Sequence, residues 1–112
     1  MYLTRDANAV TLREVAGLAP GSTLAMTFLL PLDSADAGVR PGLEMADKAA
    51  RASGTPFVSF FTPPEILALA REAGFREARH VAADELTRRY FADRTDGLRP
   101  PRNAEELLVA QT

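Results

Sequence analysis

Cysteine is absent from this sequence of 112 residues. A chain without thiols forms no disulfide, has no thiolate nucleophile and offers no zinc–thiolate site. Two further patterns are missing, because no G-x-G-x-x-G or Walker-type phosphate loop occurs and no serine stands in the G-x-S-x-G context of a hydrolase. These absences exclude several enzyme classes and leave the chain without a recognisable loop for a nucleotide-type cofactor.

Charge of one sign and long apolar runs are also scarce. The net charge is −2, and the arginines are interleaved with acids, so no basic stripe favours a nucleic-acid partner. The longest apolar run, residues 25–30, is too short to cross a membrane. The first residues lack the pattern of a signal peptide. We therefore expect a cytoplasmic protein with neither a nucleic-acid nor a membrane partner.

What is present is typical of a single domain spanning residues 1–112. Hydrophobic residues make up 46% of the sequence, which is ordinary for a folded chain and argues against disorder. The alternation of extended and helical patterns predicts an α/β fold. Strands are expected at 22–30, 76–82 and 105–111, and helices at 5–18, 41–52, 63–73 and 85–91.

The strand pattern also predicts a topology. Residues 22–30 are nearly continuously apolar, which is typical of a strand covered on both faces. This strand should run parallel to 76–82 through a helical crossover. The strand at 105–111 follows soon afterwards, so either 85–91 serves as another crossover or the last strand is an antiparallel insertion. Residues 55–61 are expected to be extended.

Local signals mark the helix ends. Thr62-Pro63-Pro64-Glu65 is a capping box, in which Thr62 and Glu65 bond to each other's backbone N–H groups. Gly74 suits the left-handed position that ends a helix, and Asp84 is expected to cap the helix at 85–91. The inward face of the helix at 41–52 is expected to consist of Leu43, Ala46, Ala49 and Ala50.

Few residues suggest catalysis. His80 is the only histidine, and it lies within the predicted strand with no second ligand at a metal-binding spacing. We interpret it as an ordinary strand residue and expect neither a metal site nor a catalytic residue. The capping box explains the position of Glu65 fully. We interpret Asp84-Glu85 as a solvated helix end and Glu105-Glu106 as a solvated strand end.

Two aromatic groups have two interpretations each. Phe57, Phe60 and Phe61 either line an apolar ligand pocket or cover the sheet, and we favour the sheet for at least two of them. The stretch Arg88–Phe91 mixes cations with aromatic rings. Arg94 and Asp96 follow it. The group either anchors a carboxylate substrate or forms surface ion pairs and a helix C-cap, and we favour the second role for each residue taken singly.

Several blocks taken in order resemble one enzyme family. The sequence is similar to the C-terminal half of bacterial class I S-adenosylmethionine-dependent methyltransferases, in the subgroup related to leucine carboxyl methyltransferases and polyketide O-methyltransferases. The resemblance covers essentially the whole chain. The blocks that carry it are Met1–Arg5, Pro20–Ser22, Gly54–Glu65, Ala73–Phe75, Arg89–Phe91 and Asp96–Leu98.

The resemblance implies a position in a larger, Rossmann-like sheet. The family has seven strands, with the last antiparallel and inserted beside the fifth. On that template Met1–Leu3 matches the end of the fourth strand, and the three predicted strands match the fifth, sixth and seventh. The family's Gly-rich turn and its ribose-binding acid match nothing in this sequence, so we expect the chain alone to be inactive.

The resemblance also implies site residues and a reaction. Tyr2 is expected to contact S-adenosyl-L-methionine, because it follows the fourth strand where open α/β sheets bind ligands. A small-molecule methyl acceptor is expected near Phe60 and Phe61 and near Arg89 and Tyr90. Methyl transfer to a carboxylate or a hydroxyl is a direct displacement that depends on positioning, so the lack of a catalytic dyad does not count against it.

An alternative function is a non-catalytic interaction module. If no strand pairs with the outer edge of residues 22–30, unpaired backbone groups on an apolar strand invite another chain. A homodimer, or a separate N-terminal half, would satisfy that edge. A small pocket protein that uses the phenylalanine cluster is a further possibility.

Overall fold

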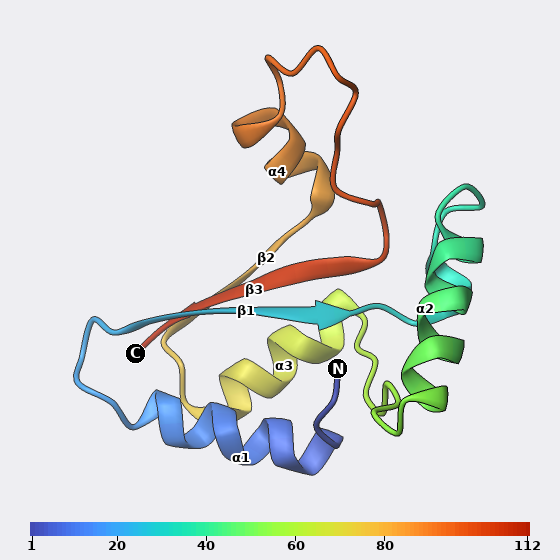
Figure 1. Ribbon diagram of the computed structural model, residues 1–112. Helices are drawn as coiled ribbons and strands as arrows, with labels where there is room; N and C mark the ends of the chain where they lie inside the picture. The colour runs from blue at the N-terminus through green and yellow to red at the C-terminus, as the bar shows by residue number, and fades with distance from the viewer.

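The computed structural model describes residues 1–112, and it confirms the α/β fold (Figure 1). Three strands and four α-helices alternate along the chain, with one short 3₁₀ helix. In chain order they are α1 (Arg5–Ala16), β1 (Thr23–Leu29), η1 (Leu32–Ser34), α2 (Arg40–Ala52), α3 (Pro63–Ala73), β2 (Glu77–Val81), α4 (Ala83–Tyr90) and β3 (Glu105–Gln111).

The last strand lies in the middle of the sheet. The strand order is β1-β3-β2, and β3 runs antiparallel to both neighbours. Strands β1 and β2 are therefore parallel to each other, with α3 in the crossover between them. The antiparallel insertion is confirmed, and α4 does not serve as a second crossover. At the centre of the register, Leu108 of β3 stands opposite Met26 of β1 and His80 of β2.

The core lies on one face of the sheet. Helices α1 and α3 pack against each other and cover that face (Figure 1). Leu12 of α1, Ile66 of α3 and Leu108 of β3 are buried between the layers. The expectation that β1 is covered on both faces is wrong, because Thr23, Ala25 and Thr27 are exposed on the opposite face. Threonine and alanine side chains tolerate exposure to solvent. Because they stand in an apolar run, the sequence alone does not show that they are exposed.

Helix α3 begins and ends as its sequence predicts. Thr62 caps it in a capping box with Glu65, and the Thr62 N–H donates to the Glu65 carboxylate at 2.8 Å. Gly74 ends the helix with a φ of 108°, a left-handed conformation that strains any residue with a side chain. Both ends of the helix are predicted correctly because the residues that cap them are neighbours in the sequence.

We expect Thr62→Ala to lower the free energy of unfolding by about 1 kcal/mol.

The same contact makes stability depend on pH, because hydrogen bonds from the Thr62 backbone and hydroxyl lower the pKa of Glu65, with a smaller effect of Arg5. The stabilisation is present above the ordinary carboxyl pKa and is lost as the pH falls through the lowered value. Urea unfolding of the wild type and of Glu65→Gln, followed from pH 7 to pH 3, measures it. Parallel curves for the two proteins would contradict the assignment.

Helices α2 and α4 differ from their predictions. Helix α2 has no buried residue, and Ala46 and Ala49 of its expected inward face are exposed, because the helix contacts η1 rather than the sheet. Helix α4 starts at Ala83, with Ala82 as its N-cap. Asp84 therefore does not cap it, since its carboxylate accepts from Arg102 at 3.0 Å instead.

The segments at residues 1–3 and 55–61 join at the end of β1 without forming strands. The carbonyl of Met1 accepts from the N–H groups of Val58 and Ser59, at 3.0 and 3.2 Å. The N–H of Phe61 donates to Leu29 O at 2.9 Å. Residues 55–61 thus form an irregular strap beside the carboxyl end of β1. None of the helices is both long enough and apolar enough to span a membrane.

Candidate functional site

A polar groove lies where the chain leaves β1 and β2. Because these strands are parallel, their carboxyl ends lie at the same end of the sheet. Open α/β sheets bind ligands at that end. The groove has a volume of about 610 Å³ and lies between the loop that precedes α2, helix α4 and the loop that precedes β3. Its lining is Asp36, Gly38, Val39, Asp84, Thr87, Arg99, Pro100, Pro101 and Arg102.

Ion pairs hold the three walls of this groove together. Arg102 donates to Asp84 of α4 at 3.0 Å and lies 3.9 Å from the carboxylate of Asp36. Asn103 also donates to Asp36, at 2.8 Å, from a left-handed backbone with a φ of 52°. Asparagine tolerates that conformation better than most residues do. The groove is thus a charged recess in which two carboxylates, Asp36 and Asp84, are balanced by two arginines, Arg99 and Arg102.

A smaller cavity of about 50 Å³ adjoins the groove and reaches Glu106. Asp84 and Arg102 line both spaces, so they form the common wall. Glu106 is only 4% exposed, and its carboxylate bonds to Nε2 of His80 on the neighbouring strand. The ring of Phe28 lies 5.8 Å from the imidazole between centroids. A carboxylate that lines the small cavity is therefore paired with an imidazole on the neighbouring strand.

This pair corrects the interpretation of Glu106 as a solvated strand end. Along β3 the even-numbered residues Glu106, Leu108 and Ala110 are buried, whereas Glu105 and Gln111 are exposed. The alternation in the sequence carries this signal, since Glu106 stands in phase with Leu108. His80 was not expected to have a partner, because 26 residues separate it from Glu106 and only the insertion of β3 beside β2 brings them together.

Tyr2 lines a separate cavity. It shares a space of about 390 Å³ with Gly54, Thr55, Pro56 and Val58. Its side chain is 61% exposed, and its ring lies 5.5 Å from that of Phe57. An aromatic surface at this position suits a flat ring such as adenine, but no charged side chain lines the cavity. Tyr2, which packs against Phe57, therefore offers one wall for a cofactor and not a complete site.

Phe60 and Phe61 lie under Arg5. The guanidinium of Arg5 lies 4.5 Å from the centroid of the Phe61 ring, donates to the carbonyl of Phe60 at 3.0 Å and pairs with Glu65 at 3.1 Å. Phe61 is 2% exposed and belongs to the core, whereas Phe60 is half-buried. A cation over an aromatic face is a stabilising contact, so this arrangement fastens α1 to the start of α3.

Arg89 and Tyr90 lie elsewhere, at the end of α4. Arg89 is 3.8 Å from Glu85 one turn earlier, and Tyr90 is 65% exposed. Neither residue lines the polar groove, although Thr87 on the same helix does. Helix α4 stands at the top of the view, away from the start of α3 (Figure 1). The structure therefore does not bring the two predicted substrate-binding groups together, and their role stays a prediction.

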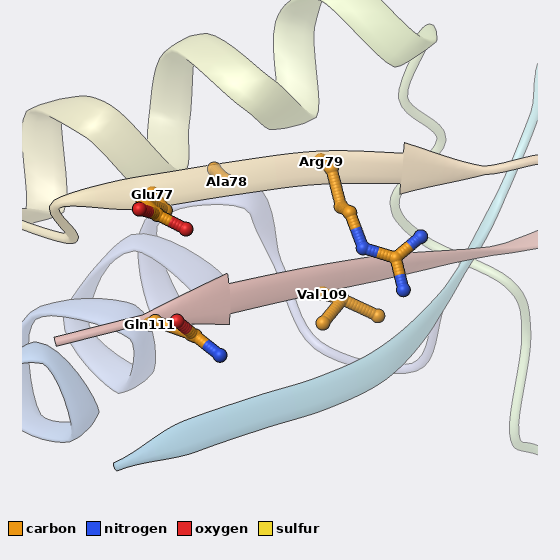
Figure 2. Close-up of a pocket in the computed structure, with 5 residues that line it drawn as sticks. All are labelled: Glu77, Ala78, Arg79, Val109 and Gln111. Atoms are coloured by element: carbon orange, nitrogen blue, oxygen red, sulfur yellow. The ribbon is translucent and has the colours of Figure 1, made fainter. Parts of the chain in front are cut away.

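A shallow pocket of about 180 Å³ lies on the uncovered face of the sheet. Figure 2 shows Arg79 extending from β2 over Val109 of β3, with Glu77 and Gln111 at the other end of the pocket. Arg79 pairs with Glu85 at 3.3 Å. The pocket lies along the strands rather than beyond their carboxyl ends, so we place the candidate site in the polar groove.

Comparison with curated proteins finds a similarity over most of the chain. Over 98 residues the chain is 30% identical to a Bacillus subtilis (strain 168) protein named "Putative S-adenosyl-L-methionine-dependent methyltransferase YktD". The match covers 87% of this chain and 32% of the relative, so the chain spans about a third of the length of the curated protein it matches. No protein-family model matches the chain. No solved structure matches it either. The similarity supports the methyltransferase class. It identifies neither a subgroup nor a methyl acceptor.

Proposed function

We propose that this chain contributes to an S-adenosylmethionine-dependent O-methyltransferase acting on a small molecule. The observation that carries the proposal is the similarity to YktD over most of the chain. The antiparallel strand inserted between two parallel ones agrees with it. In this proposal β1, β2 and β3 are the fifth, sixth and seventh strands of a Rossmann-like sheet, within the C-terminal half of a protein of the leucine carboxyl methyltransferase type.

The cofactor would lie against Tyr2, whose ring packs against Phe57. The cavity beside Tyr2 fits a flat ring, whereas the remaining contacts to the cofactor must come from residues other than those described. When bound, S-adenosylmethionine supplies an electrophilic methyl group. For the acceptor, the resemblance proposes contacts at Phe60, Phe61, Arg89 and Tyr90. The polar groove is a second proposed place for it, because the groove lies at the carboxyl ends of β1 and β2. A cytoplasmic location stays a prediction.

Binding of S-adenosylmethionine tests the proposal. By isothermal titration we expect no binding to the chain alone, because it has no Gly-rich loop. A chimera in which the chain replaces the matching region of YktD should bind the cofactor, and the same chimera with Leu108→Asp in the core should not. Binding to the chain alone tighter than about 100 µM, roughly −5.5 kcal/mol, would show that the chain is self-sufficient. A folded chimera that binds nothing would contradict the proposed function.

The free edge of β1 favours a second candidate, a module that pairs with another chain. β1 pairs with β3 on one side, and on its other side only Leu29 is bonded, through its carbonyl to the N–H of Phe61. None of its seven residues is charged or proline. Such an edge accepts a further strand, from a second copy or from an N-terminal half. A dimer on a sizing column that Ala25→Lys/Thr27→Lys converts to a monomer would support this function. The matched control is Ala46→Lys/Ala49→Lys on exposed α2, and a monomer at all concentrations would contradict the homodimer.

A further inference from the structure

We propose that Glu106, held by His80, is the proton acceptor of the polar groove, and that the groove takes a small molecule through a hydroxyl group. This inference rests on the proposed methyltransferase function and narrows it, because that function leaves open whether the acceptor atom belongs to a carboxylate or to a hydroxyl. The juxtaposition that carries the inference is a buried carboxylate beneath a polar recess.

The position of Glu106 places it next to the groove. It lines the small cavity whose wall, Asp84 and Arg102, is also a wall of the groove. A cavity of about 50 Å³ has room for a water molecule or for the hydroxyl end of a ligand. One oxygen of Glu106 is occupied by His80 Nε2. The other makes no hydrogen bond to the protein, so it is the atom that can accept one from a ligand.

His80 holds this carboxylate in place. It reaches Glu106 from β2, and the Phe28 ring of β1 flanks the imidazole on the same face of the sheet. A carboxylate and a histidine in hydrogen-bond contact are typical of groups that move protons. The charged groups facing the pair are Asp84 of α4 and Arg102 of the loop before β3, and these neutralise each other at 3.0 Å. Arg102 is also 3.9 Å from Asp36, and it makes no ion pair with Glu106.

The chemistry of the acceptor then selects a hydroxyl. A carboxylic acid has already lost its proton at neutral pH and needs no base, whereas an alcohol or a phenol must lose its proton when its oxygen is methylated. In that step the oxygen–carbon bond forms and the sulfur–carbon bond of the sulfonium breaks, with its electron pair remaining on sulfur. The hydroxyl proton passes to Glu106, directly or through one water. His80 is a positioning residue in this scheme.

Because His80 is the only histidine, the NMR signals of its ring report on this site without ambiguity. We propose to titrate the chain with phenol and, separately, with anisole, which has the same ring without the O–H. Phenol should shift the ring signals saturably, and anisole should bind at least about tenfold more weakly, since a hydrogen bond to a carboxylate is lost. Benzoate should bind no better than anisole.

Two variants complete the experiment. Glu106→Gln keeps an acceptor for His80 but turns its amide N–H₂ toward the cavity, and we expect it to abolish the preference for phenol. Glu105→Gln is the matched control on the exposed face of the same strand, and it should leave the preference unchanged. Equal responses to phenol and anisole, or tighter binding of benzoate, would overturn the inference. If a variant fails to fold, the comparison of phenol with anisole in the wild-type chain still tests the inference.

The result of the phenol titration and the result of the cofactor-binding test can be told apart. If the chimera fails to bind S-adenosylmethionine while phenol is still preferred over anisole, the methyltransferase proposal is wrong and the groove remains a hydroxyl-binding site. If the chimera binds the cofactor while phenol and anisole behave alike, the enzyme stands and Glu106 has only a structural role.

Discussion

Replacing His80 with leucine is expected to lower the free energy of unfolding by about 3 kcal/mol or more. The substitution removes the hydrogen-bond partner of Glu106, which is 4% exposed, and leaves a carboxylate buried with no compensating group. The loss therefore exceeds what a partly exposed imidazole would contribute through packing alone. Urea unfolding at pH 7, followed by circular dichroism, measures the change.

The double variant His80→Leu/Glu106→Leu separates the two contributions. Removing both partners also removes the uncompensated charge, so we expect it to recover most of the stability lost in the single variant. Arg79→Leu is the control, because its pair with Glu85 lies on the open face with the arginine side chain 53% exposed, and such pairs contribute at most about 1 kcal/mol. If His80→Leu costs no more than Arg79→Leu, Glu106 does not depend on its partner.

Leu108→Ala is expected to lower the free energy of unfolding by about 2–5 kcal/mol. Leu108 is fully buried at the centre of the middle strand, where α1 and α3 cover it. Removing its side chain opens a cavity that three strands and two helices would have to collapse to fill. The measurement is chemical unfolding of the wild type and of the variant under identical conditions.

Val109→Ala is its matched partner on the next residue of β3. Val109 points to the opposite face, where it is half-buried beside Arg79, so we expect a smaller loss of unfolding free energy, of about 1 kcal/mol. The contrast tests the one-sided layering of the fold. Equal costs at the two positions would mean that the second face is covered in solution, by another copy or by another segment.

The sequence predicts those parts of the fold that depend on neighbouring residues. Helix α3 and strand β3 have the predicted bounds, because capping chemistry defines the helix and alternation defines the strand. Strand β1 was found, but its exposed face was not, because Thr23, Ala25 and Thr27 do not interrupt an apolar run. Helix α2 was found as well, yet its orientation depends on what lies beside it, which periodicity does not encode.

The candidate site was harder to predict because its parts are distant in the sequence. Asp36, Asp84 and Arg102 meet only after two loops and a helix converge at one edge of the sheet. Glu106 and His80 meet only through the register of β2 and β3. Resemblance pointed to Tyr2, and the structure gives this residue an aromatic neighbour and a cavity, which local reasoning alone would not have found.

The central place of the last strand has a consequence for biosynthesis. Strands β1 and β2 never pair with each other, and every ladder in the sheet passes through residues 105–111. As the chain leaves the ribosome, no ladder of this sheet can close until those residues emerge, so folding must wait for translation to pass them. Until then the nascent chain carries two unpaired strands, and such exposed edges are where chaperones and aggregation compete.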